Sequence, residues 1–214
     1  SIILGVAAFD SIGANPALGL IFPVAARAIG VLASIVGVFM VRASEKDKSA
    51  MAPINRGFLT AGILTVIGTA VVAVVYVGND IGDESLPGYV SNPGWRMFGA
   101  VLIGLILAQG ASRLTEYFTS TEHAPVRDIA EAARTGPATT VLSGISSGLE
   151  SSVWAIVAIA VALGAVIGLG GGNIQFIFYL VALAGMGMLA TTGVIVSEDT
   201  FGPVADNAAG IAEM

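Results

Sequence analysis

The chain has 214 residues, of which 55% are hydrophobic and 11% are charged. Soluble domains carry about 25% charged residues, so this composition predicts a membrane protein. The absence of cysteine excludes disulfides and thiolate metal sites, and the net charge of −6 argues against a nucleic-acid partner.

Long apolar runs recur along the sequence and predict an all-α, polytopic bundle of transmembrane helices, with five full spans and the end of a sixth. About 20 apolar residues are needed to cross the hydrocarbon core of a bilayer. We expect a single membrane domain over residues 1–214, and an internal fragment of a longer chain because no signal peptide is visible. The predicted spans are 1–13 (partial), 22–42, 57–78, 97–118, 139–168 and 174–206.

Polar or glycine-rich connections separate these spans. Residues 10–20 include Asn15 and Pro16 and are predicted to be a connection. Residues 42–56 are predicted to be a solvated loop. Residues 168–173 are rich in glycine but lack the lysine of a phosphate-binding loop, so they are predicted to form a tight turn.

Two charged residues fall inside predicted spans. Arg27 lies near the start of its span, where snorkelling or pairing with another helix is the simpler interpretation and ion conduction the alternative. Glu150 lies in the first half of the fourth span. An intramembrane carboxylate is a candidate for an ion path, and the alternative is a structural role in which nearby serines or a neighbouring helix satisfy it.

The fourth span also contains two pairs of glycines four residues apart, Gly144 with Gly148 and Gly164 with Gly168. This spacing allows two membrane helices to approach closely. We therefore expect both pairs to mark helix contacts and not ligand sites.

The distribution of basic residues predicts the orientation of the chain. Five spans place the loops 42–56 and 113–138 on the same side as the C-terminal segment. Of the nine basic residues, Arg96 alone falls on the opposite side and Arg27 lies within a span. The positive-inside rule therefore places both loops and the C-terminal segment in the cytoplasm. The seven basic residues on this side are Arg42, Lys46, Lys48, Arg56, Arg113, Arg127 and Arg134.

The C-terminal segment places three carboxylates on one predicted helix face. Asp199, Asp206 and Glu213 are seven residues apart, which corresponds to nearly two helical turns. Successive carboxylates would be separated by about 10 Å along the helix axis. Such a stripe at the end of a membrane helix is costly unless it binds cations or pairs with basic groups, and its hard oxygens suit Mg²⁺.

Two segments carry a resemblance to a known family. Residues 199–214 read DTFGPVADNAAGIAEM, and the earlier segment contains Glu116-Tyr-Phe-Thr-Ser, Pro125-Val126 and Arg134-Thr-Gly-Pro-Ala-Thr. Both resemble signatures of the membrane-bound, ion-translocating pyrophosphatases. The chain differs at Ala209, where the family usually has glycine, and at Thr140, where asparagine is common. The resemblance covers about residues 22–214.

The resemblance implies a homodimer in contact with membrane lipid. Each chain would have about sixteen helices, because a helix hydrogen-bonds its own backbone and can therefore cross a bilayer. It implies hydrolysis of pyrophosphate to phosphate, coupled to transport of H⁺ (or Na⁺) out of the cytosol. Mg²⁺ is the implied cofactor, and dependence on K⁺ is left open. The expected location is the bacterial plasma membrane.

The resemblance also implies roles for individual residues. Asp206 matches a family aspartate of the magnesium–pyrophosphate site and is the candidate metal ligand, with Asn207 and Asp199 as further site residues. Glu150 and Glu213 are candidates for the ion path or for structural roles. The family's water-activating aspartates and substrate lysines lie outside this segment, so we assign no catalytic residue and expect the isolated chain to be inactive.

Two other function classes are compatible with the residues. A non-enzymatic secondary transporter or divalent-cation channel would use the acidic stripe to bind the transported cation, with Glu150 lining the path. The second half of the chain has no lysine to bind phosphate, which slightly favours this alternative. The second class is a structural membrane scaffold, whose function would not require the carboxylate of Asp206. The two motif matches favour the pump.

Overall fold

The structure is a computed structural model that describes residues 1–42 and 51–213. Much of the loop predicted for residues 42–56 therefore lies outside the described residues. The prediction is wrong for residues 51–56, because helix α3 begins at Met51. Pro53 lies in the first turn of α3, where the lack of an N–H removes no helical hydrogen bond.

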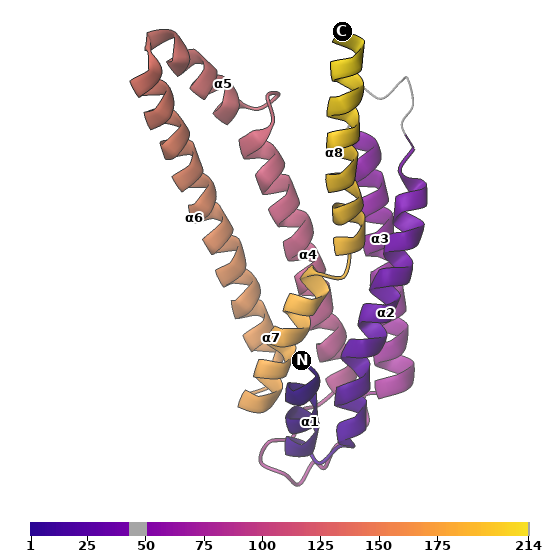
Figure 1. Cartoon of the computed structure of the whole chain (residues 1–214). Helices are drawn as coiled ribbons and strands as arrows, with labels where there is room; N and C mark the ends of the chain where they lie inside the picture. The colour runs from indigo at the N-terminus through magenta and orange to yellow at the C-terminus, as the bar shows by residue number, and fades with distance from the viewer. Residues whose placement is uncertain (43–50, 214) are drawn as a thin grey trace. The chain divides into compact units, whose positions relative to one another are not determined.

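The described residues form helices and contain no strand. Five helices are long and apolar enough to cross a membrane, which confirms the predicted all-α class. The elements are α1 (Ile2–Ser11), α2 (Pro16–Met40), α3 (Met51–Val71), the π-helical η1 (Val72–Val77), α4 (Pro93–Thr119), α5 (Ala124–Ala132), the 3₁₀ turn η2 (Ala133–Thr135), α6 (Pro137–Leu169), α7 (Ile174–Met188) and α8 (Thr192–Glu213) (Figure 1).

The chain divides into two compact units, which are described separately. Unit 1 comprises Ser1–Leu105 and Val166–Met214, and unit 2 comprises Ile106–Ala165. Helices α4 and α6 each contribute residues to both units. Within unit 1, α8 lies beside α2 and α3 (Figure 1).

Aromatic side chains form the centre of unit 1. Phe9, Phe22, Phe176 and Tyr179 come from three different helices and are fully buried. The hydroxyl of Tyr179 donates a hydrogen bond to the backbone carbonyl of Gly19 at 2.8 Å. The buried phenol is therefore satisfied, and it joins α7 to α2 while its ring contributes to the apolar core.

Helix α2 begins earlier than predicted. The side chain of Asn15 accepts a hydrogen bond from the backbone N–H of Ala17 at 3.0 Å, and Pro16 occupies the first helical position. Asparagine before a helix and proline at its first position are strong start signals. Residues 12–15 do connect α1 to α2, but the predicted connection is wrong for residues 16–20, where turn-forming residues begin a helix. The span predicted at 22–42 therefore begins at Pro16.

Residues 170–172 form the predicted turn between α6 and α7, and Asn173 fixes the start of α7. The Asn173 side chain accepts a hydrogen bond from the N–H of Phe176 at 3.0 Å. Its amide also donates to the hydroxyl of Ser11 at 3.0 Å and to the carbonyl of Gly88 at 2.7 Å. One side chain thus caps α7 and holds it to α1 and to the loop before α4.

The predicted span 174–206 is interrupted. Helix α7 ends at Met188, and α8 begins at Thr192. The sequence around the break is apolar except for Thr191, Thr192 and Gly193, so hydrophobicity alone predicted one helix. The carbonyls at this break accept hydrogen bonds from side chains of α2 and from Thr192.

Close helix contacts do occur at glycines, but not at the predicted ones. Among the described residues, no atom outside the local helix lies within 4 Å of a Cβ built at Gly144, Gly148, Gly164 or Gly168. The expectation of helix contacts at these pairs is therefore not met in the described part of the chain. In unit 1, a Cβ at Gly19 would instead overlap the backbone of Gly5 on α1.

We expect the substitution Gly19→Ala to destabilise unit 1. The added Cβ would lie 2.7 Å from the carbonyl carbon of Gly5 and 2.6 Å from the ring of Phe9, and overpacking of this kind costs about 1–3 kcal/mol. Thermal unfolding of the purified protein in detergent would show a lowered midpoint. The matched control is Gly110→Ala in α4, where nothing lies within 4 Å of the new Cβ. Equal midpoints for the two variants would contradict the predicted close packing.

Candidate functional site

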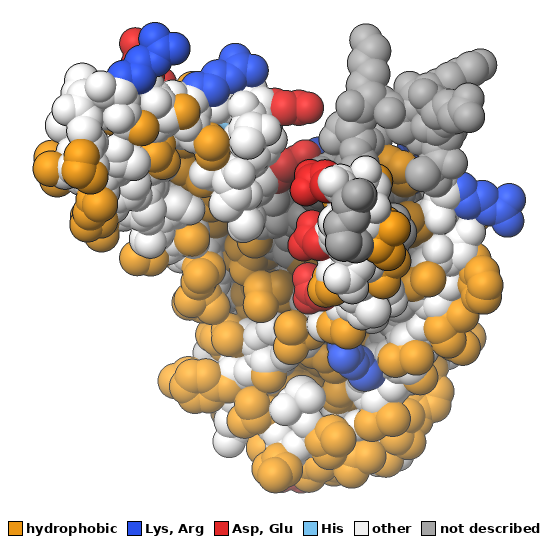
Figure 2. Space-filling view, turned by 45° about the horizontal axis from the view of Figure 1, so that its top comes forward, with side chains coloured by type: hydrophobic (Ala, Val, Ile, Leu, Met, Phe, Trp, Pro, Cys, Tyr) orange, Lys and Arg blue, Asp and Glu red, His pale blue; other side chains and the backbone are white. Residues whose placement is uncertain are grey.

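Helix α8 carries an exposed acidic face. Asp199, Asp206 and Glu213 all lie on this single helix, and the side chains of all three are exposed. Because seven residues fall about 20° short of two full turns, the three carboxylates follow one another along nearly the same side. Figure 2 shows acidic side chains in a row on this part of the molecule. The structure thus brings three of the predicted site residues onto one face.

The spacing of these carboxylates limits what they can bind. Adjacent members are about 10 Å apart along the axis, whereas Mg²⁺ binds its oxygen ligands at about 2.0–2.1 Å. Two neighbouring carboxylates of α8 therefore cannot share one ion. Among the described residues, no group of three or more acidic or histidine side chains could hold a metal ion.

The donor chemistry nevertheless fits magnesium. Asp206 offers hard oxygens in an exposed position, and Asn207 next to it adds an exposed amide oxygen. Adjacent side chains on a helix point about 100° apart, so Asn207 faces a different direction from Asp206. Each α8 carboxylate can supply one ligand, and water and phosphate oxygens are the usual completion of a magnesium shell.

A proline inside α8 adds a further acceptor beside Asp199. Pro203 has no N–H to donate to the backbone carbonyl four residues earlier, which is that of Asp199. The carbonyl of Asp199 therefore lacks its usual helical donor.

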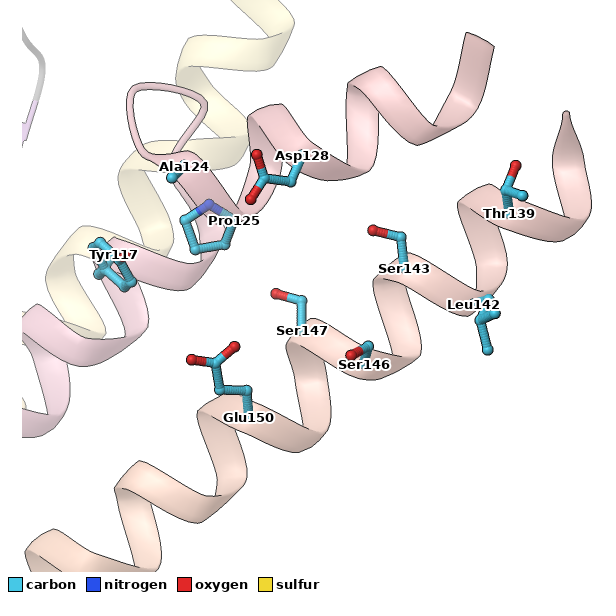
Figure 3. A pocket seen from close by; sticks show the side chains of 10 residues that line it. All are labelled: Tyr117, Ala124, Pro125, Asp128, Thr139, Leu142, Ser143, Ser146, Ser147 and Glu150. Carbon is cyan, nitrogen blue, oxygen red and sulfur yellow. The ribbon is translucent and has the colours of Figure 1, made fainter. Parts of the chain in front are cut away.

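Unit 2 contains a separate polar groove of about 490 Å³. The α6 residues that line it include Thr139, Ser143, Ser147 and Glu150, which share one helix face by their spacing. Figure 3 shows Ser143, Ser147 and Glu150 projecting from α6 into the groove. Opposite them lie Tyr117 at the end of α4, and Ala124, Pro125 and Asp128 of α5.

Glu150 is exposed in this groove and has no hydrogen-bond partner among the described residues. The nearby Ser152 does not satisfy it, because its hydroxyl donates to the carbonyl of Gly148 at 2.9 Å. The alternative in which neighbouring serines neutralise Glu150 is therefore not met within the described part of the chain. Its carboxylate is free to take a cation or a polar group from another helix.

Arg27 contacts the end of another helix, as the simpler interpretation of the sequence predicted, but its position and its partner were not predicted. This residue is the twelfth of the 25 residues of α2, so it lies near the middle of the helix and not near its start as predicted. Its guanidinium donates a hydrogen bond to the carbonyl of Leu189, in the break between α7 and α8. The only sequence signal was a charged residue inside an apolar run, which could not name the partner.

The comparisons with known proteins give the class of the chain. Residues 1–214 match the sequence model of the family described as inorganic H⁺ pyrophosphatase, so the chain belongs to this family. Together with the five apolar helices, this membership makes the chain part of an integral membrane protein.

Three relatives illustrate the range of the family. The chain is 43% identical to a K⁺-insensitive pyrophosphate-energized proton pump of Streptomyces coelicolor and 41% identical to one of Chloroflexus aurantiacus, in both cases over its whole length. It is 37% identical, over 92% of its length, to a putative K⁺-stimulated pyrophosphate-energized sodium pump of Clostridium tetani. The chain spans 27%, 28% and 27% of these relatives, respectively.

We expect the isolated 214-residue chain to bind Mg²⁺ weakly and to be inactive on pyrophosphate. One carboxylate per ion is a poor ligand set, so the dissociation constant should be about 1 mM or weaker. Calorimetric titration of the purified chain with Mg²⁺, and phosphate release from pyrophosphate, would measure the two properties. Tight stoichiometric binding or sustained phosphate release would contradict the incomplete ligand set described above.

Proposed function

We propose that the chain is the part of a membrane pump that contributes the acidic face of α8 to a magnesium–pyrophosphate site. Such a pump hydrolyses inorganic pyrophosphate to phosphate and couples the reaction to ion translocation. The observation that carries the proposal is that the whole chain aligns with pumps of this name and presents its exposed carboxylates in the matching C-terminal motif. The share of each relative that is covered supports a segment of a longer protein.

The chemistry explains why a site for an anionic substrate would use carboxylates. Pyrophosphate carries several negative charges and would be repelled by Asp206 alone. Bound Mg²⁺ reverses this repulsion, positions the substrate and neutralises charge on the leaving phosphate. Asp206 is proposed to supply one oxygen ligand to such an ion, while Asp199 and Asn207 hold water or phosphate around it.

The remaining two acids are assigned more distant roles. Glu213 lies about 10 Å beyond Asp206 on the same face and is proposed to pair with a basic group of another helix. Glu150 stands in unit 2, in a groove lined by hydroxyls and without a partner among the described residues. We propose it as a candidate for the ion path, because an unneutralised carboxylate in a membrane helix is retained where function needs it.

The ion proposed for transport is H⁺. The two relatives named proton pumps are 43% and 41% identical to the chain, whereas the one named a sodium pump is 37% identical. The same comparison favours activity that does not depend on K⁺. A homodimer is proposed as well, because the apolar surface of α6 around Leu142, Leu149 and Trp154 is exposed in unit 2 and needs lipid or another chain to cover it.

We expect Asp206→Asn to abolish most pyrophosphate hydrolysis by the full-length pump that contains these residues. Loss of the negative charge weakens Mg²⁺ binding at the substrate, and removing one group that stabilises charge in a transition state costs about a hundredfold or more. Phosphate release by membranes would be compared at equal expression, with and without Mg²⁺.

The matched control for this experiment is Glu122→Gln, which neutralises an exposed carboxylate of unit 2. Its activity should equal that of the wild type. Full activity of Asp206→Asn would show that the carboxylate of Asp206 is not needed in the substrate site. Absence of activity in the wild type would favour the alternative function, a cation transporter.

The proposed orientation places residues 113–138 and α8 in the cytoplasm of a bacterium. The 214 residues contain no cysteine, so the orientation can be tested with single cysteines at two exposed positions, Asp80 and Glu122, once any cysteines elsewhere in the parent chain are replaced. In intact cells, a membrane-impermeant maleimide should label the Asp80→Cys variant, whereas Glu122→Cys should be labelled only after lysis. The reverse pattern would show that the positive-inside argument fails for this chain.

A further inference from the structure

At the break between α7 and α8, the carbonyl of Leu189 accepts hydrogen bonds from the N–H of Thr192 at 3.3 Å and from its hydroxyl at 2.7 Å. Helix α7 ends at Met188, and α8 begins again at Thr192. Ala190 is 6% exposed and Thr191 is fully buried, so this short connection lies inside unit 1. In a membrane, a carbonyl that loses its helical partner needs another donor, because lipid provides none.

Helix α2 supplies two further donors to the carbonyls of the break. Arg27 donates a hydrogen bond to the carbonyl of Leu189, across 162 positions in the sequence. Ser34 lies about two turns after Arg27 on α2, and its hydroxyl lies 3.5 Å from the carbonyl oxygen of Ala190. Each of the two consecutive carbonyls of the break therefore accepts a hydrogen bond from one side chain of α2.

The shape of α2 matches the break as well. A Cβ at Gly30, which lies between the two donors, would come within 2.7 Å of the Ala190 carbonyl oxygen. A Cβ at Gly193 would come within 2.9 Å of the Cβ of Ser34. Positions 27, 30 and 34 share one face of α2, so this face fits the backbone of the break closely.

The charge of Arg27 is otherwise uncompensated in the described part of the chain. It has no carboxylate partner there, and it borders a cavity of about 200 Å³ that Ser34 and Ser197 also line. A charged side chain near the middle of a membrane helix is costly and is typically retained for a function. The negative end of the α7 dipole, at Leu189, is the group that the guanidinium contacts.

We propose that Arg27 is a positioning residue for the acidic face of α8. By holding the carbonyl of Leu189, it fixes where α7 ends and hence the residue at which α8 begins. Moving that start by one residue would turn the helix by about 100° relative to α2. The direction of Asp199 and Asp206 therefore depends on the hydrogen bond of Arg27. The part of this inference that concerns activity rests on the proposed pyrophosphatase function.

The test uses the full-length pump with Arg27→Met, which removes the donor, and Arg27→Lys, which keeps one. Spin labels on Phe39→Cys and Ile211→Cys, two exposed positions on α2 and α8, would report the distance between the helices. Activity would be measured separately in proteins that keep Phe39 and Ile211. The matched control is Arg96→Met, because Arg96 also donates to a helix-terminal carbonyl, that of Leu169, but on α6.

Arg27→Met should shift or broaden the distance distribution and lower kcat/KM for magnesium–pyrophosphate by roughly tenfold or more per folded molecule, because small displacements of a site cost up to about a hundredfold. The distance distribution and the kcat/KM of Arg27→Lys should lie between those of Arg27→Met and those of the wild type. Arg96→Met should reduce thermal stability while leaving the distance and the KM of the folded protein unchanged. This combination separates positioning from a general loss of stability.

Two outcomes would overturn the proposal. An unchanged distance distribution in Arg27→Met would show that the hydrogen bond does not set the direction of α8. A changed distribution with unchanged kcat and KM would show that this direction does not matter to the site. Absence of hydrolysis in the wild type would instead reject the proposed function, and the distance measurement would still decide whether Arg27 orients α8.

Discussion

The need to satisfy every backbone polar group in an apolar medium governs this structure. Continuous helices meet the requirement by themselves, but each helix end must find another partner. At the start of α7 the partner is the side chain of Asn173, and at the end of α6 it is Arg96, which donates to Leu169 at 2.5 Å. At the break after α7 the partners are Thr192 of α8 and, from α2, Arg27 and Ser34. At each of these helix ends, polar side chains thus provide hydrogen-bond partners that the helix itself lacks.

The same constraint shapes the candidate site. Helix α8 starts again beside α2, passes through Pro203 and presents its carboxylates on an exposed face. Because these carboxylates are about two turns apart, each must find its cation and its remaining ligands beyond α8. A face of this kind suits a site assembled from several helices around a charged substrate, and it explains why the described residues contain no complete metal centre.

Unit 2 shows how one long helix can combine two environments. Along its first half, α6 has one polar face that ends at Glu150, whereas large apolar side chains such as Leu149 and Trp154 are exposed elsewhere on its surface. Lipid or another protein chain is the natural partner of the apolar part, and a polar helix or a cation is the natural partner of the groove.

The sequence by itself determined the membrane class, the helical content and the acidic face of α8, since these follow from composition, apolar run length and helical period. It also determined the family, through the two motifs. It could not determine that α2 begins at Pro16, because the same residues form turns and helix starts. Thr191, Thr192 and Gly193 lie at the break, but such residues also occur inside membrane helices and did not predict it. The donor Arg27 comes from α2, 162 positions away from Leu189. Only tertiary structure brings Arg27 to that carbonyl, and with it decides where α8 begins.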